Sequence, residues 1–160
     1  MDTTISETRL EGAALDAWRS YLQSHASIVR VLDAELVADH SITVRDYEVM
    51  LYLAQEPTRS LAMSALAERT MLTRSGITRL VDGLVEAELI ERLACDNDAR
   101  VSYAHLTDSG YEKLRAAGCS HVMSIRRLFL EHFSPEEIDL LASLLSRLPG
   151  ARPEGQCTVD

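Results

Sequence analysis

The spacing of apolar residues along the chain changes from helical to strand-like and then back to helical. This order limits the folds that the chain can adopt. Up to Glu86 the apolar residues recur every three or four positions, which indicates amphipathic helices. Two short strand-like stretches follow, Leu89 to Ala94 and Val101 to Leu106, separated by the polar, turn-prone residues 95–100. Helical spacing then returns. A single hairpin inside a helical chain predicts a mainly α fold with one small β-wing.

Apolar stripes and capping residues place the first four helices. We expect a long helix from Leu15 to about Ala38, a second from Thr43 to about Gln55, a short third from Met63 to Arg69, and a fourth that is capped by Thr73 and ends near Glu86. The three residues between the third and fourth helices are expected to form a tight turn. This part of the chain is therefore predicted to form four helices, with breaks at 41–43, 56–58 and 70–72.

Two more helices are predicted after the hairpin. Thr107 or Asp108 begins a long one. The last helix has a strong start, because Ser134 can cap it, Pro135 suits the first helical position and Glu137 can complete a capping box. We expect this helix to end at 148–150.

The third and fourth helices with their tight turn form a helix-turn-helix, and the hairpin behind them makes the unit winged. The fourth helix has one apolar face, formed by Ile77, Leu80, Val81 and Leu84. Its other face is polar and consists of Arg74, Ser75, Thr78, Arg79 and Asp82. Serine and threonine can bind phosphates or bases, and arginine can form paired hydrogen bonds with guanine. We interpret this face as a DNA-reading surface, with a solvated face of no function as the alternative.

The total charge argues at first against nucleic acid, because 16 basic and 25 acidic residues leave a net charge of −9. The acidity is unevenly distributed along the chain. Residues 1–57 have a net charge of −6, residues 58–105 of −1 and residues 106–160 of −2. The region with the helix-turn-helix is therefore nearly neutral, and its outward arginines matter more than the total.

Composition and motifs exclude several classes of protein. A chain of 160 residues is expected to form one domain. It has neither a secretion signal nor an apolar run long enough to cross a membrane, and its three cysteines lack metal-site spacing, so we expect a cytoplasmic protein. A Gly-rich phosphate loop, a nucleophile elbow and a metal-spaced His–Glu set are also missing. We therefore expect no enzyme, cofactor or metal.

Several segments resemble the MarR-type winged-helix transcription regulators. They are Leu61–Glu68, Leu72–Asp82, Leu89–Arg92, and a wing motif Asn97-Asp98-Ala99-Arg100 followed by Leu106-Thr107. The resemblance covers about residues 14–148. It implies a single MarR-type chain, 1–160, with a winged helix-turn-helix lobe at 42–106, long dimerisation helices at 11–41 and 107–148, and a flexible tail at 149–160.

By this resemblance the protein is a homodimeric repressor that binds double-stranded DNA. Its two recognition helices would read pseudo-palindromic half-sites about 34–36 Å apart. The implied DNA-contacting residues are Ser64, Thr73, Arg74, Ser75, Thr78, Arg79, Asp98 and Arg100. Arg100 suits insertion into the minor groove, and Asp98 is expected to pair with Arg100 and to set the hairpin.

The chain departs from the family pattern at three places. Gly83 stands where many relatives carry arginine, Glu88 replaces a usual glycine before the first strand of the hairpin, and the wing has one arginine instead of two. Each change lowers the positive charge, so we expect modest DNA affinity and a shallow dependence on salt. The turn at Glu88 is also expected to be built differently.

The last helix is too apolar to pack on one side only. Ile138, Leu141, Leu145 and Leu148 form one stripe, and Leu140 and Leu144 form a second beside it. This independently favours a dimer. The expected interface residues are Leu128, Ile138, Leu141, Leu144, Leu145 and Leu148.

Relatives commonly bind a small aromatic or anionic effector between the dimerisation helices and the winged lobe. The candidate residues here are Trp18, Asp46, Tyr47 and Arg92, which resemble a subgroup that responds to urate or phenolic acids. Other interpretations stay open, because Trp18 can belong to the core and Asp46 can stabilise the first turn of its helix. The alternative function is a winged-helix protein-interaction module that has lost DNA binding. The net charge favours this alternative, whereas Arg74, Arg79 and Arg100 argue against it.

Overall fold

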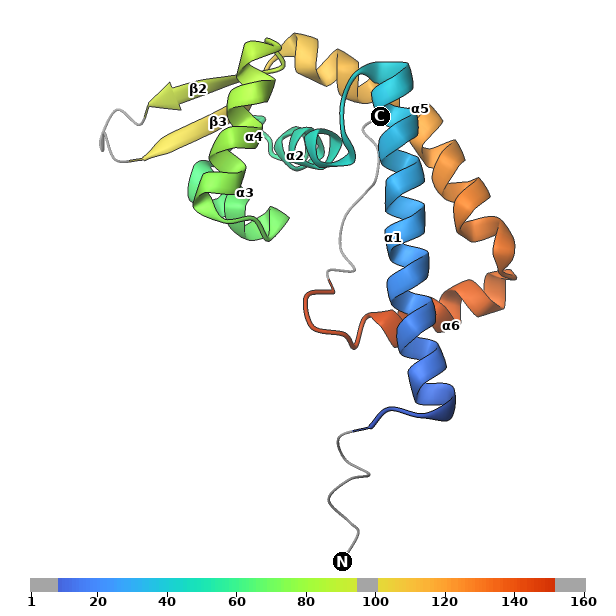
Figure 1. Cartoon of the computed structure of the whole chain (residues 1–160). Helices are drawn as coiled ribbons and strands as arrows, with labels where there is room; N and C mark the ends of the chain where they lie inside the picture. Colours follow the sequence, from blue (N-terminus) through green and yellow to red (C-terminus); the bar gives the residue numbers. More distant parts are fainter. Residues whose placement is uncertain (1–8, 95–100, 152–160) are drawn as a thin grey trace, which may run out of the picture.

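A winged lobe lies beside a pair of long helices that run along one another (Figure 1). The structure is a computed structural model and describes residues 9–94 and 101–151. Its elements are α1 (Gly12–His40), α2 (Val44–Ala54), β1 (Ser60–Ala62), α3 (Met63–Thr70), α4 (Arg74–Glu86), β2 (Ile90–Ala94), β3 (Ser102–Leu106), α5 (Asp108–Leu128), the short 3-10 helix η2 (Leu130–His132) and α6 (Pro135–Leu145). The lobe comprises α2 to β3. Helix α5 returns along α1, and α6 crosses the N-terminal half of α1.

Helices α2, α4, α5 and α6 begin where their capping residues predict, whereas α1 and α3 have no side-chain cap. Thr43, Thr73, Thr107 and Ser134 each accept a hydrogen bond from the backbone N–H three residues further on. The caps at Thr43 and Ser134 are full capping boxes, in which the third residue bonds back to the backbone N–H of the cap. Of the two possible starts of α5, Thr107 is the cap and Asp108 the first helical residue.

Two left-handed residues set the turns around α4. Met71, between α3 and α4, has φ 53°, and Glu88, between α4 and β2, has φ 60°. A residue other than glycine costs about 1–2 kcal/mol in this region. The turn at Glu88 thus has a backbone that glycine adopts most easily, and the glutamate bears the strain.

The sheet has three strands, so the prediction of a two-stranded wing was incomplete. Strand β1 pairs antiparallel with β3, with Ser60 opposite His105, and the strand order is β1-β3-β2. The strand escaped prediction because three residues are too few to show alternation, and α3 follows without a loop. Its central residue, Leu61, points into the core and is 9% exposed.

Helix α6 is shorter than predicted and ends at Leu145. After Leu145 the backbone changes to hydrogen bonds three residues back, from Arg147 N to the Leu144 carbonyl at 3.3 Å and from Leu148 N to the Leu145 carbonyl at 3.0 Å, and Pro149 cannot continue a helix. The hydroxyl of Ser146, the C-cap, donates to the carbonyl of Ser143 at 2.9 Å. Most of the predicted flexible tail, residues 152–160, lies outside the described residues.

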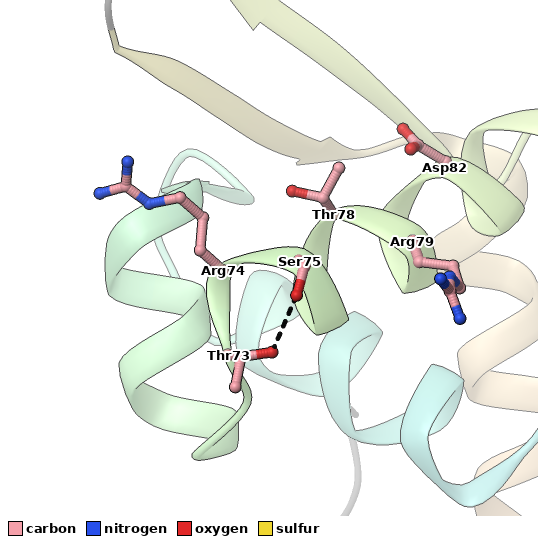
Figure 2. Close-up of a pocket in the computed structure, with 6 residues that line it drawn as sticks. All are labelled: Thr73, Arg74, Ser75, Thr78, Arg79 and Asp82. Carbon is pink, nitrogen blue, oxygen red and sulfur yellow. Dashed lines mark hydrogen bonds between the residues drawn. The ribbon is translucent and has the colours of Figure 1, made fainter.

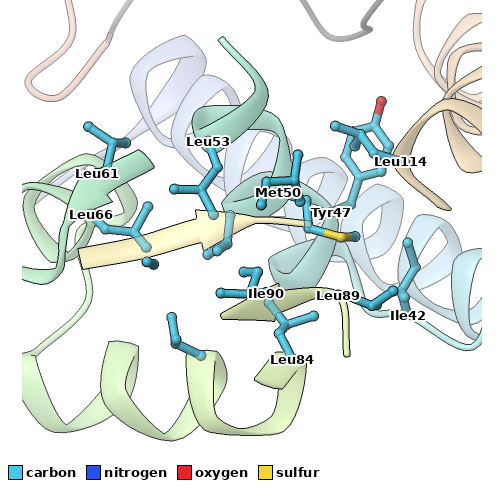
Figure 3. Packing of buried hydrophobic residues seen from close by; sticks show 14 of the residues in the cluster. Ile42, Tyr47, Met50, Leu53, Leu61, Leu66, Leu84, Leu89, Ile90 and Leu114 are labelled. Carbon is cyan, nitrogen blue, oxygen red and sulfur yellow. The ribbon is translucent and has the colours of Figure 1, made fainter. Parts of the chain in front are cut away.

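The core of the lobe surrounds α2 (Figure 3). Met50 and Leu53 of α2 are fully buried, and they pack with Leu66 of α3, Ile90 of β2 and Leu114 of α5. The apolar face of α4 closes the same core, because its residues Ile77, Val81 and Leu84 are at most 3% exposed. The polar face of α4 is therefore directed to the outside of the lobe.

At Gly110 the backbone of α5 packs closely against Leu89 and Leu106. A Cβ atom added there would overlap the Leu89 carbonyl oxygen and lie 2.7 Å from Leu106 Cδ1. We expect Gly110→Ala to lower the free energy of unfolding by about 1–3 kcal/mol, because α5 would have to move away from the sheet. Chemical denaturation measures this loss.

The matched control is Gly83→Ala, because a Cβ added at Gly83 meets nothing within 4 Å. This change should stabilise the protein by about 0.5–1 kcal/mol through the higher helix propensity of alanine. Equal effects of the two substitutions would show that the α5–sheet contact is not tight.

Candidate nucleic-acid interface

The exposed face of α4 forms an open depression of about 750 Å³ on the lobe (Figure 2). The side chains that line it come from successive turns of one helix and are all exposed. They are Thr73, Arg74, Ser75, Thr78, Arg79 and Asp82. The structure thus places the predicted polar residues of α4 on one outward surface.

The start of α4 is rigidly capped. Thr73 Oγ1 accepts from Gly76 N at 3.1 Å and lies 3.2 Å from Ser75 Oγ. The capping role leaves the Thr73 hydroxyl proton able to reach a phosphate. Backbone N–H groups and the helix dipole also favour an anion at such an end.

Two arginines lie at opposite ends of the depression and extend away from the helix, Arg74 and Arg79 (Figure 2). Neither guanidinium has an ion-pair partner in the part of the chain that the structure describes. Both are therefore available to phosphates or to guanine edges.

One acidic side chain, Asp82, lies among these residues. Arg92 of β2 binds it, with 2.7 Å between Arg92 Nη2 and Asp82 Oδ1. The same nitrogen is 3.4 Å from the carbonyl oxygen of Thr78. The contact links β2 to α4, and the sequence could not indicate it because the two residues come from different elements.

The remaining predicted DNA contacts lie beside α4 or beyond the described residues. Ser64 is exposed in the first turn of α3. Asp98 and Arg100 of the wing fall within residues 95–100, which the structure does not describe. The strands that flank this segment are antiparallel, and Ala94 pairs with Ser102 at their ends.

Each of the four predicted effector residues has different surroundings within the single chain. Trp18 is 51% exposed, so the alternative interpretation of Trp18 as a core residue does not hold for the single chain. Asp46 closes the capping box of α2, which confirms its structural role. Tyr47 is buried against His121 of α5, with 4.6 Å between ring centroids, and Arg92 binds Asp82 on α4.

An apolar groove of about 820 Å³ runs between the N-terminal half of α1, the end of α5 and α6. Trp18 lines it together with most of the predicted interface residues, which are Leu141, Leu144, Leu145 and Leu148. Of the other two, Ile138 is half-buried and Leu128 lines a neighbouring pocket of about 500 Å³. None of the described residues of α6 is buried, so this apolar helix is only partly covered in the single chain.

A helix-turn-helix followed by a β-wing, with an outward arginine-bearing face on its second helix, defines a winged-helix DNA-binding protein. A MarR family model matches residues 40–101. Two MarR family transcriptional regulators from Streptomyces coelicolor have similar structures. AbsC is 30% identical with a TM-score of 0.81, over 86% of this chain and 92% of AbsC. Sco3205, solved in complex with DNA, is 31% identical with a TM-score of 0.81, over 86% of each chain.

A curated relative spans nearly the same length. YkoM of Bacillus subtilis, an uncharacterized HTH-type transcriptional regulator, is 26% identical over 92% of each chain. The chain belongs to the MarR family. It is a transcriptional regulator, as its relatives are, and not an enzyme. None of the helices within the described residues is both long and apolar enough to cross a membrane.

His121 contributes an acid-sensitive contact between α5 and the lobe. Its ring is 8% exposed, and Nδ1 has no hydrogen-bond partner among the described residues. Burial lowers the pKa of His121, so the folded protein keeps the ring neutral where the unfolded chain would already protonate it. The unfolded state then binds more protons, and stability falls as the pH drops below the ordinary histidine value of about 6.5.

We expect His121→Phe to reduce the loss of stability between pH 7.5 and pH 5.5, because phenylalanine can pack on Tyr47 without titrating. Thermal or denaturant unfolding at both pH values measures the effect. His132→Phe is the control, since His132 is exposed on η2. An unchanged pH dependence in His121→Phe would contradict the assignment.

Proposed function

We propose that the protein is a homodimeric repressor that binds a pseudo-palindromic operator through α4 and the wing. The observation that carries this proposal is the exposed arginine-bearing face of α4. The fold of a relative solved in complex with DNA supports it. Such a regulator works in the cytoplasm, where its DNA lies. The nearly neutral charge of residues 58–105 allows approach to the duplex.

The proposed DNA contacts fall into two groups, those that read base edges and those that bind phosphates. Ser75, Thr78 and Arg79 face the major groove and read base edges. The positions of Ser64, Thr73 and Arg74 at the starts of α3 and α4 suit phosphate contacts that set the register. Arg100 enters the minor groove, and Asp98 orients it.

A second copy of the chain covers the apolar groove. Its proposed interface consists of Leu128, Ile138, Leu141, Leu144, Leu145 and Leu148. Leu144 and Leu148 are each 44% exposed in the single chain, and such a continuous apolar surface is typical of a subunit contact. The resulting dyad would set two α4 helices about 34–36 Å apart, one turn of DNA.

A small aromatic or anionic effector releases the operator by favouring a dimer geometry that no longer fits the half-site spacing. Tyr47 packs on His121 where α2 of the lobe meets α5, and Asp46 precedes it in the first turn of α2, which suits such coupling. Trp18 offers an aromatic surface in the groove. To bind the effector, Arg92 would have to break its ion pair with Asp82.

We expect Arg79→Ala to weaken operator binding by about 1–3 kcal/mol and to relax base preference, because its guanidinium reads a base. Electrophoretic shift on the upstream DNA of its own gene and on random DNA measures both. Arg147→Ala is the control, an exposed arginine after α6.

Equal losses on both DNAs would contradict base reading by Arg79. If the unaltered protein shifts no fragment at low salt, the alternative of a protein-interaction module replaces the proposed function. Aromatic acids added to the preformed complex test the effector, whose action predicts release of DNA.

Leu144→Glu should weaken dimerisation about 100-fold or more, because a carboxylate would be buried in the apolar groove. Sedimentation or light scattering over a concentration series measures the dissociation constant. The control is Ser143→Glu, since Ser143 is exposed on α6 and does not line the groove. A dimer that tolerates Leu144→Glu would place the interface elsewhere.

A further inference from the structure

The negative charge of Asp82 opposes the proposed role of α4 in DNA binding. It lines the same depression as Arg74 and Arg79, and its side chain is 54% exposed. A carboxylate on a surface that meets DNA phosphates weakens binding through like-charge repulsion. An uncompensated Asp82 would therefore offset one of the two arginines.

Arg92 compensates this charge from a different element. Its Nη2 atom lies 2.7 Å from Asp82 Oδ1 and 3.4 Å from the carbonyl oxygen of Thr78. Thr78 and Asp82 are one helical turn apart, so a single guanidinium spans a turn of α4. Arginine suits this position because its planar group donates in several directions.

The solvent exposure of Arg92 and Asp82 limits how much their ion pair can stabilise the fold. Both side chains are well hydrated, 32% exposed in Arg92 and 54% in Asp82, so the ion pair adds little to the stability of the fold. Its location on the DNA-facing side gives it another effect, because DNA removes water from this surface and makes an unpaired charge more costly.

We propose that Arg92 is a positioning residue for DNA binding, which cancels the charge of Asp82 and orients the Asp82 carboxylate toward the wing strand β2. This inference rests on the proposed function of α4. It differs from a direct phosphate contact, in which Arg92 would bind DNA itself and Asp82 would play no part.

A double-mutant cycle separates these two roles. We would measure operator and random-DNA affinity at several salt concentrations for the unaltered protein, Arg92→Ala, Asp82→Asn and the double variant. We expect Arg92→Ala to bind the operator about tenfold more weakly, since it uncovers Asp82. The double variant should recover to within about threefold of the unaltered protein.

Asp82→Asn alone tests the other half of the pair. It leaves Arg92 with a free positive charge, so binding to random DNA should strengthen several-fold and the preference for the operator should fall. Arg92→Lys keeps the charge without the planar group and should lie between Arg92→Ala and the unaltered protein.

Arg59→Ala is the matched control. Arg59 forms a similar surface ion pair, 2.9 Å from Asp108 Oδ1, between the loop before β1 and the start of α5. Its removal should leave DNA affinity unchanged. Unfolding midpoints of all variants check that the fold is intact.

The inference is overturned if the double variant stays about tenfold weaker and its salt slope falls by about one, since this is the behaviour of a phosphate contact. Absence of DNA binding by the unaltered protein contradicts the proposed function instead. The two failures are therefore distinguishable.

Discussion

The burial of one face of α4 is the contact on which the rest of the lobe depends. Ile77, Val81 and Leu84 close the core around α2. Because this face of α4 is buried, the opposite face of the same helix must lie on the surface. The hydrophobic effect provides most of the free energy of folding, and it acts here on residues that never meet DNA. The arrangement of arginines, serine and threonine outside follows from the packing inside.

Charge is organised on a finer scale than the net charge of −9 suggests. Residues 58–105, which include the helix-turn-helix and the wing, have a net charge of only −1, and the rest of the chain carries the remaining −8. Within the lobe, Arg92 compensates the acidic residue on the polar face of α4. Coulomb interactions are screened within about 8–10 Å at physiological salt, so these local pairs decide how the surface meets a phosphate backbone.

Local signals predicted the helical part of the fold well. The caps at Thr43, Thr73 and Ser134 act within four residues of chain, and their positions in the structure confirm them. Strand β1 could not be predicted in this way, because its pairing with β3 joins residues about 45 apart in sequence. The end of α6 was placed too late, since apolar spacing continues to Leu148 whereas the α-helical hydrogen bonds stop near Leu145.

The sequence by itself determined the order of elements, the polar face of α4 and the apolar character of α6. Each depends on spacing along one helix or on a cap within it. Only the tertiary structure decided which side chains from different elements meet. It brought Arg92 to Asp82 and Tyr47 to His121, and it left Trp18 in a groove instead of the core. Contacts of this kind depend on how whole elements pack, and no short pattern in the sequence records them.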